Sequence, residues 1–320
     1  MTELFVHYSK HARCQAFVAE KPWLKKASTI MLFALLVSLF PALLLLSCQI
    51  QGDLDIPFRT ITAHNSENAR YRAVILVLAS AKSPLDVFFK EVWMAYMNCE
   101  PRHIKVYFVY GSHERVGLKN ESWGPNDLVY DDIPEQYPVP IAKVVKALKY
   151  IDAKHEYDFL VRTNLSTFWV LQNLLRILDD LPTRLCYFGD GPLPPSKAPA
   201  ERYYLSGIDT IVNRYMVSEL VQYAEQHPEW ADLLDPEDKQ MGLFFHGILG
   251  APLRPSSPYF MEHYASEDSG RLAEDIRSAM WRKATHFRVK SAPENRLLVD
   301  SFIMRGLLHH YYRLNFQKVT

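Results

Sequence analysis

The hydrophobic pattern divides the chain into one long apolar run near the N-terminus and a larger region of short alternating patterns. Residues 29–48 carry no charged side chain and are numerous enough for a helix to cross a hydrocarbon core of roughly 30 Å. Lys and Arg side chains precede this run, while Asp53 and Asp55 follow it, which predicts a cytosolic N-terminus. The predicted organisation is a cytosolic tail (1–28), a transmembrane anchor (29–48), a polar stem (49–71) and a domain (72–320).

Two other interpretations of the apolar run remain open. Leu45-Leu46-Ser47-Cys48 looks like a bacterial lipobox, in which Cys48 would be lipidated after cleavage. A cleaved signal peptide is the other, although the apolar part of a signal usually spans about 7–15 residues, which is shorter than this run. Each interpretation places the bulk of the chain outside the cytosol.

Unbroken apolar runs in the larger region predict strands buried on both faces, as in a parallel sheet covered by helices. The predicted strands are Ala73–Ala79, Ile104–Tyr110, Leu128–Tyr130, Tyr157–Val161, Leu185–Phe188, Tyr203–Ser206 and His286–Lys290. The predicted helices are Phe88–Cys99, Ile141–Ala153, Phe168–Leu178, Ile211–Gln226, Gln240–Leu249 and Leu297–Tyr312. This alternation is typical of an α/β domain with a mostly parallel central sheet flanked by helices.

Composition excludes some function classes. The 36 Lys and Arg residues balance 36 Asp and Glu residues, so no nucleic-acid partner is predicted. Four cysteines are too few for a disulfide scaffold. Cys99 and Cys186 could form a bridge in an oxidising compartment, but two buried free thiols are the favoured interpretation.

Three polar clusters could carry chemistry. Arg162–Ser166 follows a predicted strand, where polar residues either cap a helix or contact a ligand at the carboxyl end of the sheet. Asp235–Asp238 has the pattern of a helix start, which explains its acids without any function. His286, Arg288 and Lys290 would share one side of a strand, facing either solvent or an anion such as a phosphate.

The order of these motifs goes further than each motif alone. Arg162-Thr163-Asn164-Leu165-Ser166 ends a strand, Tyr204-Leu205-Ser206-Gly207 reads as a turn, and Glu237-Asp238 stands four residues before Gly242. Together with Lys143 on an upstream helix, they resemble the motifs of the β-1,3-galactosyltransferase-like glycosyltransferases. The resemblance covers roughly Ala73 to Gly250. It implies a GT-A-like fold, a nucleotide-sugar donor, a glycan acceptor and a single-pass protein of the Golgi or another secretory-pathway membrane, with its domain in the lumen.

The resemblance also implies roles for individual residues. Asp238 aligns with the general base of inverting members, and Glu237 would orient or contact the acceptor. The donor would be bound by the polar strand end, the turn, the upstream lysine and the basic strand; these residues are Arg162, Asn164, Ser166, Gly207, Lys143, His286, Arg288 and Lys290.

One departure from the family concerns the metal. The family's acidic metal-binding triplet is replaced by Asn164-Leu165-Ser166, which offers no carboxylate to a divalent cation. Mn²⁺ is therefore a possible cofactor that the residues do not favour, and positioned cations would have to neutralise the departing nucleoside diphosphate. We expect an inverting sugar transfer with little or no metal dependence. The alternatives are a retaining transferase and a catalytically silent GT-A-fold protein that binds glycans or acts as a scaffold.

Overall fold

The computed structural model describes residues 70–80, 83–112, 123–135, 141–191, 204–231, 235–255, 262–264, 274, 278, 284–291 and 296–314. The predicted tail (1–28) and anchor (29–48), and the stem up to residue 69, lie outside the described residues. None of the described helices is long and apolar enough to cross a membrane. The chain divides into two compact units, Met1–Thr62 and Ala63–Thr320, and every described element belongs to the second.

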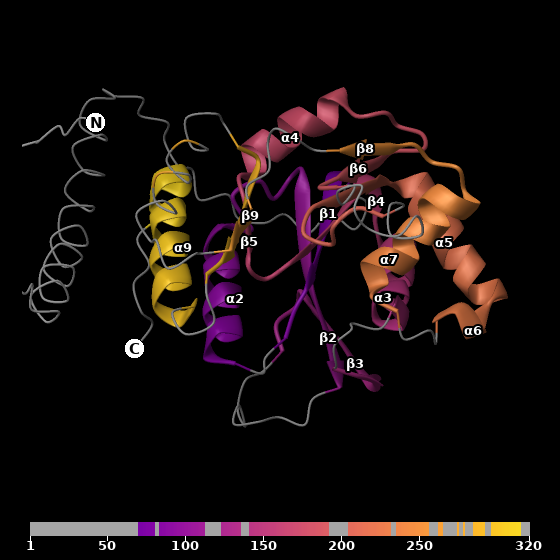
Figure 1. Ribbon diagram of the computed structural model, residues 1–320, viewed down its shortest axis with the longest axis horizontal. Helices are drawn as coiled ribbons and strands as arrows, with labels where there is room; N and C mark the ends of the chain where they lie inside the picture. Colours follow the sequence, from indigo (N-terminus) through magenta and orange to yellow (C-terminus); the bar gives the residue numbers. More distant parts are fainter. Residues whose placement is uncertain are drawn as a thin grey trace, which may run out of the picture. The chain divides into compact units, whose positions relative to one another are not determined.

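A seven-stranded sheet forms the centre of the described domain, with the strand order β3-β2-β1-β4-β7-β6-β8 (Figure 1). The strands are β1 (Arg70–Leu78), β2 (Ile104–Ser112), β3 (Asp127–Pro134), β4 (Glu156–Asn164), β6 (Tyr187–Gly189), β7 (Thr210–Asn213) and β8 (Leu253–Pro255). Strands β1 to β4 run parallel, while β7 runs antiparallel to both β4 and β6. The predicted α/β fold with a mostly parallel sheet is confirmed.

A second sheet of three described strands has the order β5-β10-β9. Its strands are β5 (Thr167–Trp169), β10 (His286–Lys290) and β9 (Glu262–Tyr264). Strand β10 pairs antiparallel with β5, which follows β4 directly in the chain, and the register places Arg288 opposite Thr167. A C-terminal segment is thereby brought to the carboxyl end of β4.

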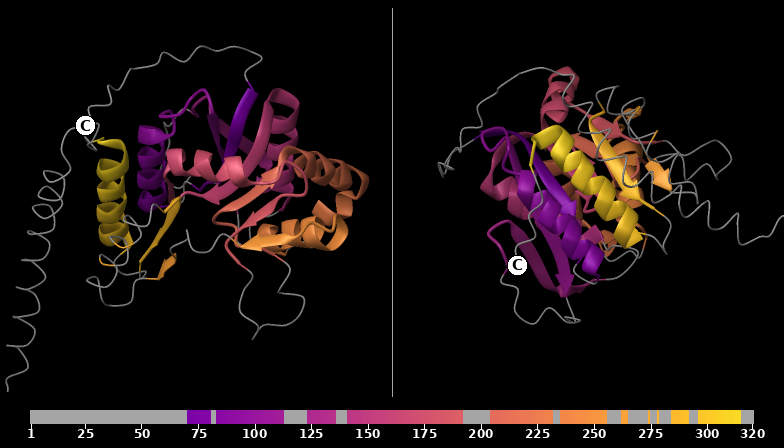
Figure 2. Two further views of the ribbon diagram at one scale, coloured as in Figure 1. Left: turned by 90° about the horizontal axis from the view of Figure 1, so that it is seen from above. Right: turned by 90° about the vertical axis from the view of Figure 1, so that its left-hand side faces the viewer.

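Helices cover both faces of the larger sheet, with α2 and α9 on one face and α3 and α5 on the other (Figures 1 and 2). The helices are α2 (Pro84–Tyr96), α3 (Ile141–Lys154), α4 (Leu171–Asp180), α5 (Arg214–Gln226), α6 (Pro228–Ala231), α7 (Glu237–Gly242), the π-helical stretch η2 (Leu243–Ile248) and α9 (Arg296–Tyr312). Alternate residues of β1 enter two separate hydrophobic cores, Ile75 on one face and Val74 on the other, and both are fully buried. This confirms the prediction of a strand buried on both faces.

Two short strands contradict the predicted elements. Phe168 was expected to open a helix, but it lies in β5, and α4 starts only at Leu171. Ile211 was also expected in a helix, but it lies in β7, whereas Tyr204–Ser206 of the predicted strand forms no strand. In both cases pairing with distant strands overrides the local helical spacing.

Strand β3 is longer than predicted. It continues through Asp131 and Asp132, which were expected to stop it, and ends at Pro134. Both aspartates are exposed on a strand at the edge of the sheet, where charged side chains remain hydrated and discourage pairing with another chain.

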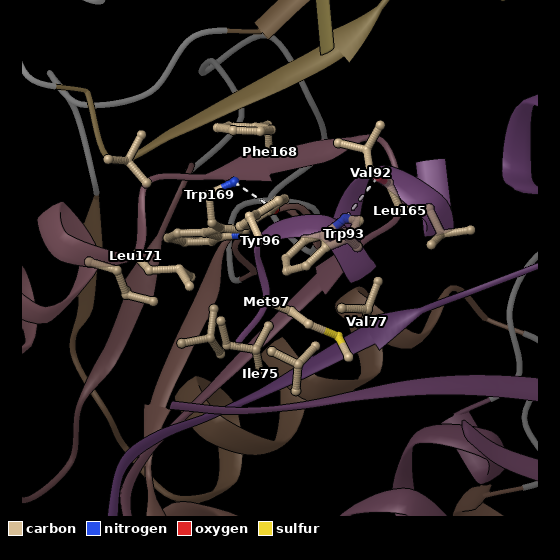
Figure 3. Close-up of a cluster of buried hydrophobic side chains, with 14 of the residues drawn as sticks. Ile75, Val77, Val92, Trp93, Tyr96, Met97, Leu165, Phe168, Trp169 and Leu171 are labelled. Atoms are coloured by element: carbon tan, nitrogen blue, oxygen red, sulfur yellow. Dashed lines mark hydrogen bonds between the residues drawn. The ribbon is translucent and has the colours of Figure 1, made fainter. Parts of the chain in front are cut away.

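Buried aromatic side chains fix the segment that follows β4 (Figure 3). The Trp93 indole N–H donates to the Leu165 carbonyl at 3.0 Å, and the Tyr96 hydroxyl accepts the Trp169 N–H at 3.2 Å. The Tyr312 hydroxyl donates to the Trp169 carbonyl at 2.8 Å. Because these rings are packed in the core, the polar residues between them sit on a rigid support.

Candidate functional site

The carboxyl end of β4 presents a buried arginine to α7. Arg162 forms an ion pair with Glu237, and each side chain is only 6% exposed. Burial lowers the pKa of Arg162 to about 10, while the nearby Asp238 carboxylate acts in the opposite direction. Arg162 therefore remains a cation at neutral pH, and the ion pair joins α7 to the central sheet.

Gly207 is required for the close approach of its turn to Arg162. A Cβ atom at this position would overlap the Arg162 guanidinium. Its backbone N–H donates to Asp238 Oδ2 at 3.2 Å. A side chain at position 207 would therefore require the buried Arg162 guanidinium to move.

Asp238 is half-buried in the first turn of α7 and accepts two backbone N–H groups. Besides Gly207, the N–H of Lys239 donates to Asp238 Oδ1 at 2.8 Å. Pro236 occupies the cap position of this helix without a side-chain cap, and Asp235 pairs with Lys239 at 2.9 Å. The predicted helix start is confirmed, with Glu237 and Asp238 in the first turn of α7, where acids complement the helix dipole, but no side chain caps the helix.

Asn164 anchors the basic strand at the end of β4. Its side-chain oxygen accepts from the hydroxyls of Ser166 and Thr167, at 3.3 and 3.0 Å, and from a guanidinium N–H of Arg288. The capping interpretation of Asn164 and Ser166 is wrong, because Val170 occupies the cap position of α4 and no side chain caps that helix. The polar strand end therefore holds Arg288.

His286 is buried in the same region. Its ring packs on the Trp169 ring with centroids 4.7 Å apart, and its Nε2 lies 3.4 Å from Asp209 Oδ2. Burial lowers the pKa of His286 to about 3. The imidazole is therefore neutral at pH 7, and His286 does not supply the cation that the sequence suggested.

Two predicted site residues have other surroundings. Lys143 is buried on α3 and pairs with Glu135 at 2.9 Å; Glu135 also accepts the Gly111 N–H at 2.6 Å. This pair lies at the ends of β2 and β3, which β1 separates from β4 in the sheet. Lys290 is half-buried at the end of β10. The structure brings together Arg162, Asn164, Ser166, Gly207, Glu237, Asp238, His286 and Arg288.

Sequence reasoning missed Asp209. Its side chain is 1% exposed, its Oδ1 accepts the Asp190 N–H at 2.7 Å, and its Oδ2 faces His286. The position of this acid between the apolar residues Ile208 and Ile211 is a pattern from which a buried carboxylate could have been predicted.

The residues at the end of β4 do not fit a divalent cation. Among the described residues, no group of three His, Cys, Asp or Glu side chains could hold a metal ion. The groups available are the Asn164 amide and two hydroxyls, and Arg288 already occupies the amide oxygen. A hard cation prefers carboxylates and would have to displace this guanidinium.

Comparison with known proteins finds likenesses among solved structures only. No protein-family model and no curated protein matches the chain. A solved structure of a glycosyltransferase involved in the glycosylation of the major capsid of PBCV-1 is similar with a TM-score of 0.42 and 9% identity. The likeness covers 72% of this chain and 98% of that chain. At this level of likeness, function must be inferred from the site residues.

Proposed function

We propose that this protein transfers a sugar from a nucleotide-sugar donor to a glycan hydroxyl, with inversion and without a metal ion. The observation that carries the proposal is the contact of Arg288 with Asn164 at the end of β4. Ligands of parallel α/β sheets bind at such strand ends, and a guanidinium there can bind a diphosphate. Asp238 is held nearby through Gly207 and Arg162, so an acid and a cation serve one site.

In the proposed reaction, Asp238 removes the proton from the acceptor hydroxyl as its oxygen attacks the anomeric carbon of the donor. The new bond forms on the side opposite the nucleotide, so the configuration inverts. The bond from the anomeric carbon to the nucleoside diphosphate breaks, and its electron pair leaves with the phosphate oxygen. Arg288 stabilises the negative charge that develops there.

Glu237 receives a different role from the one the resemblance implied. Its carboxylate pairs with Arg162 in the interior, so we assign it to holding α7 and Asp238 in place rather than to the acceptor. Ser166 and Thr167 orient the Asn164 amide towards Arg288. Lys290 remains a proposed contact for a more distant part of the donor, whereas we assign Lys143, which is buried and paired with Glu135, to holding α3 against the end of β3.

The proposed location follows from the sequence. A helix at Thr29–Cys48 would anchor the protein in a secretory-pathway membrane, such as the Golgi, with its N-terminus in the cytosol. This arrangement would keep the domain close to glycan acceptors in the lumen.

The test uses the full-length chain with a panel of UDP- and GDP-sugars and measures the release of nucleoside diphosphate in the presence of a glycan acceptor. We expect release that EDTA does not reduce. Asp238→Asn should lower turnover about a thousandfold, within the range of general-base catalysis. Asp235→Asn is the matched control, because Asp235 lies in the same loop and pairs with Lys239 at a half-exposed position; it should retain activity.

Three outcomes would contradict parts of the proposal. Unchanged turnover in Asp238→Asn would remove this residue from the reaction. Activity lost in EDTA and restored by Mn²⁺ would contradict metal independence. If no donor in the panel releases nucleoside diphosphate, the catalytically silent alternative is supported.

A further inference from the structure

We infer that Asp209 is a positioning residue, which sets the places of Arg288 and Asp238 although it touches neither reacting group. The inference rests on the proposed function. It starts from an unusual feature: Asp209 is a carboxylate in the interior, 1% exposed, in a turn between two strands. An asparagine could accept the Asp190 N–H equally well, so the hydrogen bond alone does not explain a buried charge.

The surroundings of Asp209 form a closed ring of contacts. Asp209 Oδ2 faces His286 Nε2 at 3.4 Å, and the His286 ring packs on Trp169. The Trp169 indole N–H donates to the Thr163 hydroxyl at 3.1 Å, and this hydroxyl donates to the Ile208 carbonyl at 2.6 Å. Ile208 precedes Asp209, which closes the ring across β4, β5, β10 and the turn before β7.

This ring reaches the proposed catalytic groups from two directions. His286 and Arg288 are alternate residues of β10 and lie on the same side of that strand, so fixing His286 directs Arg288 towards Asn164. Gly207 lies in the same turn as Asp209 and donates to Asp238. Displacement of Asp209 would therefore disturb both ends of the site.

The charge of Asp209 has a further effect on the arginines. Burial lowers the pKa of Arg162 and repulsion by Arg288 lowers it further, whereas the carboxylates of Asp238 and Asp209 act in the opposite direction. The Asp209 carboxylate therefore reduces the cost of holding the Arg162 cation in the interior, beside Arg288. It thereby helps to retain Arg288 at Asn164 before a donor arrives.

The experiment is a double-mutant cycle read out by nucleotide affinity. UDP and GDP are titrated calorimetrically into the full-length protein, and the cycle uses the nucleotide that the wild type binds. The variants are Asp209→Asn, Arg288→Gln and the double variant. We expect Asp209→Asn to weaken binding about tenfold in the wild-type background and to have no further effect with Arg288→Gln, because coupled residues are non-additive.

A structural control separates positioning from loss of stability. Asp152 accepts hydrogen bonds from Arg214 and Ser218 at the opposite end of the sheet. Asp152→Asn should lower the melting temperature and leave nucleotide affinity unchanged. If Asp209→Asn does not fold, His286→Gln takes its place in the cycle, with the same non-additivity expected.

The outcomes distinguish this inference from the function on which it rests. Unchanged affinity in Asp209→Asn, or losses that add with those of Arg288→Gln, would overturn the role of Asp209 alone. Unchanged affinity in Arg288→Gln, or no nucleotide binding by the wild type, would overturn the proposed anion site and the inference with it.

Discussion

The two ends of the central sheet carry ion pairs of different kinds. At the amino ends of β1 and β4, Arg70 and Arg72 pair with Asp158, whose side chain is 20% exposed, and the Arg70 side chain is 74% exposed. At the carboxyl end of β4, Arg162 and Glu237 are each 6% exposed. The same chemical pair is thus hydrated at one end of the sheet and enclosed at the other.

The difference indicates where function lies. Exposed pairs stay hydrated and contribute little to stability, so they need no explanation beyond solubility and modest stabilisation. Enclosed pairs lose their hydration, and desolvation can exceed the attraction between the charges. Buried charges with shifted pKa values, such as Arg162, gather at functional sites, which favours the carboxyl end as the place of chemistry.

The largest expected effect comes from breaking an enclosed pair. Glu237→Gln removes the ion-pair partner of the buried Arg162 cation and should lower the free energy of unfolding by about 3 kcal/mol. Urea unfolding monitored by circular dichroism measures this change. A loss below about 1 kcal/mol would mean that this buried pair contributes no more to stability than an exposed pair, which would contradict the comparison.

The second effect is a pH dependence caused by His286. Its pKa is about 3 in the folded protein and about 6.5 when unfolded, so only the unfolded chain takes up a proton between these values. The contribution of neutral His286 to the free energy of unfolding is fully present above about pH 6.5. It should fall as the pH decreases, by up to about 1.4 kcal/mol per pH unit. Urea midpoints between pH 7 and 5 measure the slope, and His286→Gln should flatten it. An equal slope in that variant would refute this origin.

The smallest effect is expected at the amino end. Arg214 pairs with Asp152 at 3.0 Å and with Glu156, with its side chain 30% exposed. Arg214→Gln should lower the free energy of unfolding by about 1 kcal/mol or less, and part of the loss should disappear in high salt because salt screens exposed charges. Thermal unfolding at low and high ionic strength tests both points. A larger, salt-insensitive loss would mean that the two ends of the sheet do not differ.

Much of the fold could be predicted from local pattern. The unbroken apolar runs of β1 and β4 predict burial on both faces, and the structure confirms it. The short strands β5 and β7 could not be found in this way, because their three or four residues acquire strand geometry only by pairing with distant segments. Local spacing contains no information about such partners.

The candidate site was predictable only in part. The position of Asn164 after a strand and the alternation of β10 indicated residues that the structure places together. Asp209 was missed because its importance depends on His286, which lies far along the chain. The roles of these residues, the membrane anchor and the absence of a metal requirement stay predictions.

The aromatic cluster behind the site has a consequence for how the protein folds. Tyr312, in the last described helix, accepts the N–H of Leu171 at 2.8 Å and donates to the Trp169 carbonyl, across separations of 141 and 143 residues. Contacts between such distant segments form slowly, because the entropy of closing a long loop must be overcome first. The support beneath Asn164 therefore becomes complete only after α9 has docked. We therefore expect assembly of the site to be a late folding event, coupled to closure of the whole domain rather than to formation of β4.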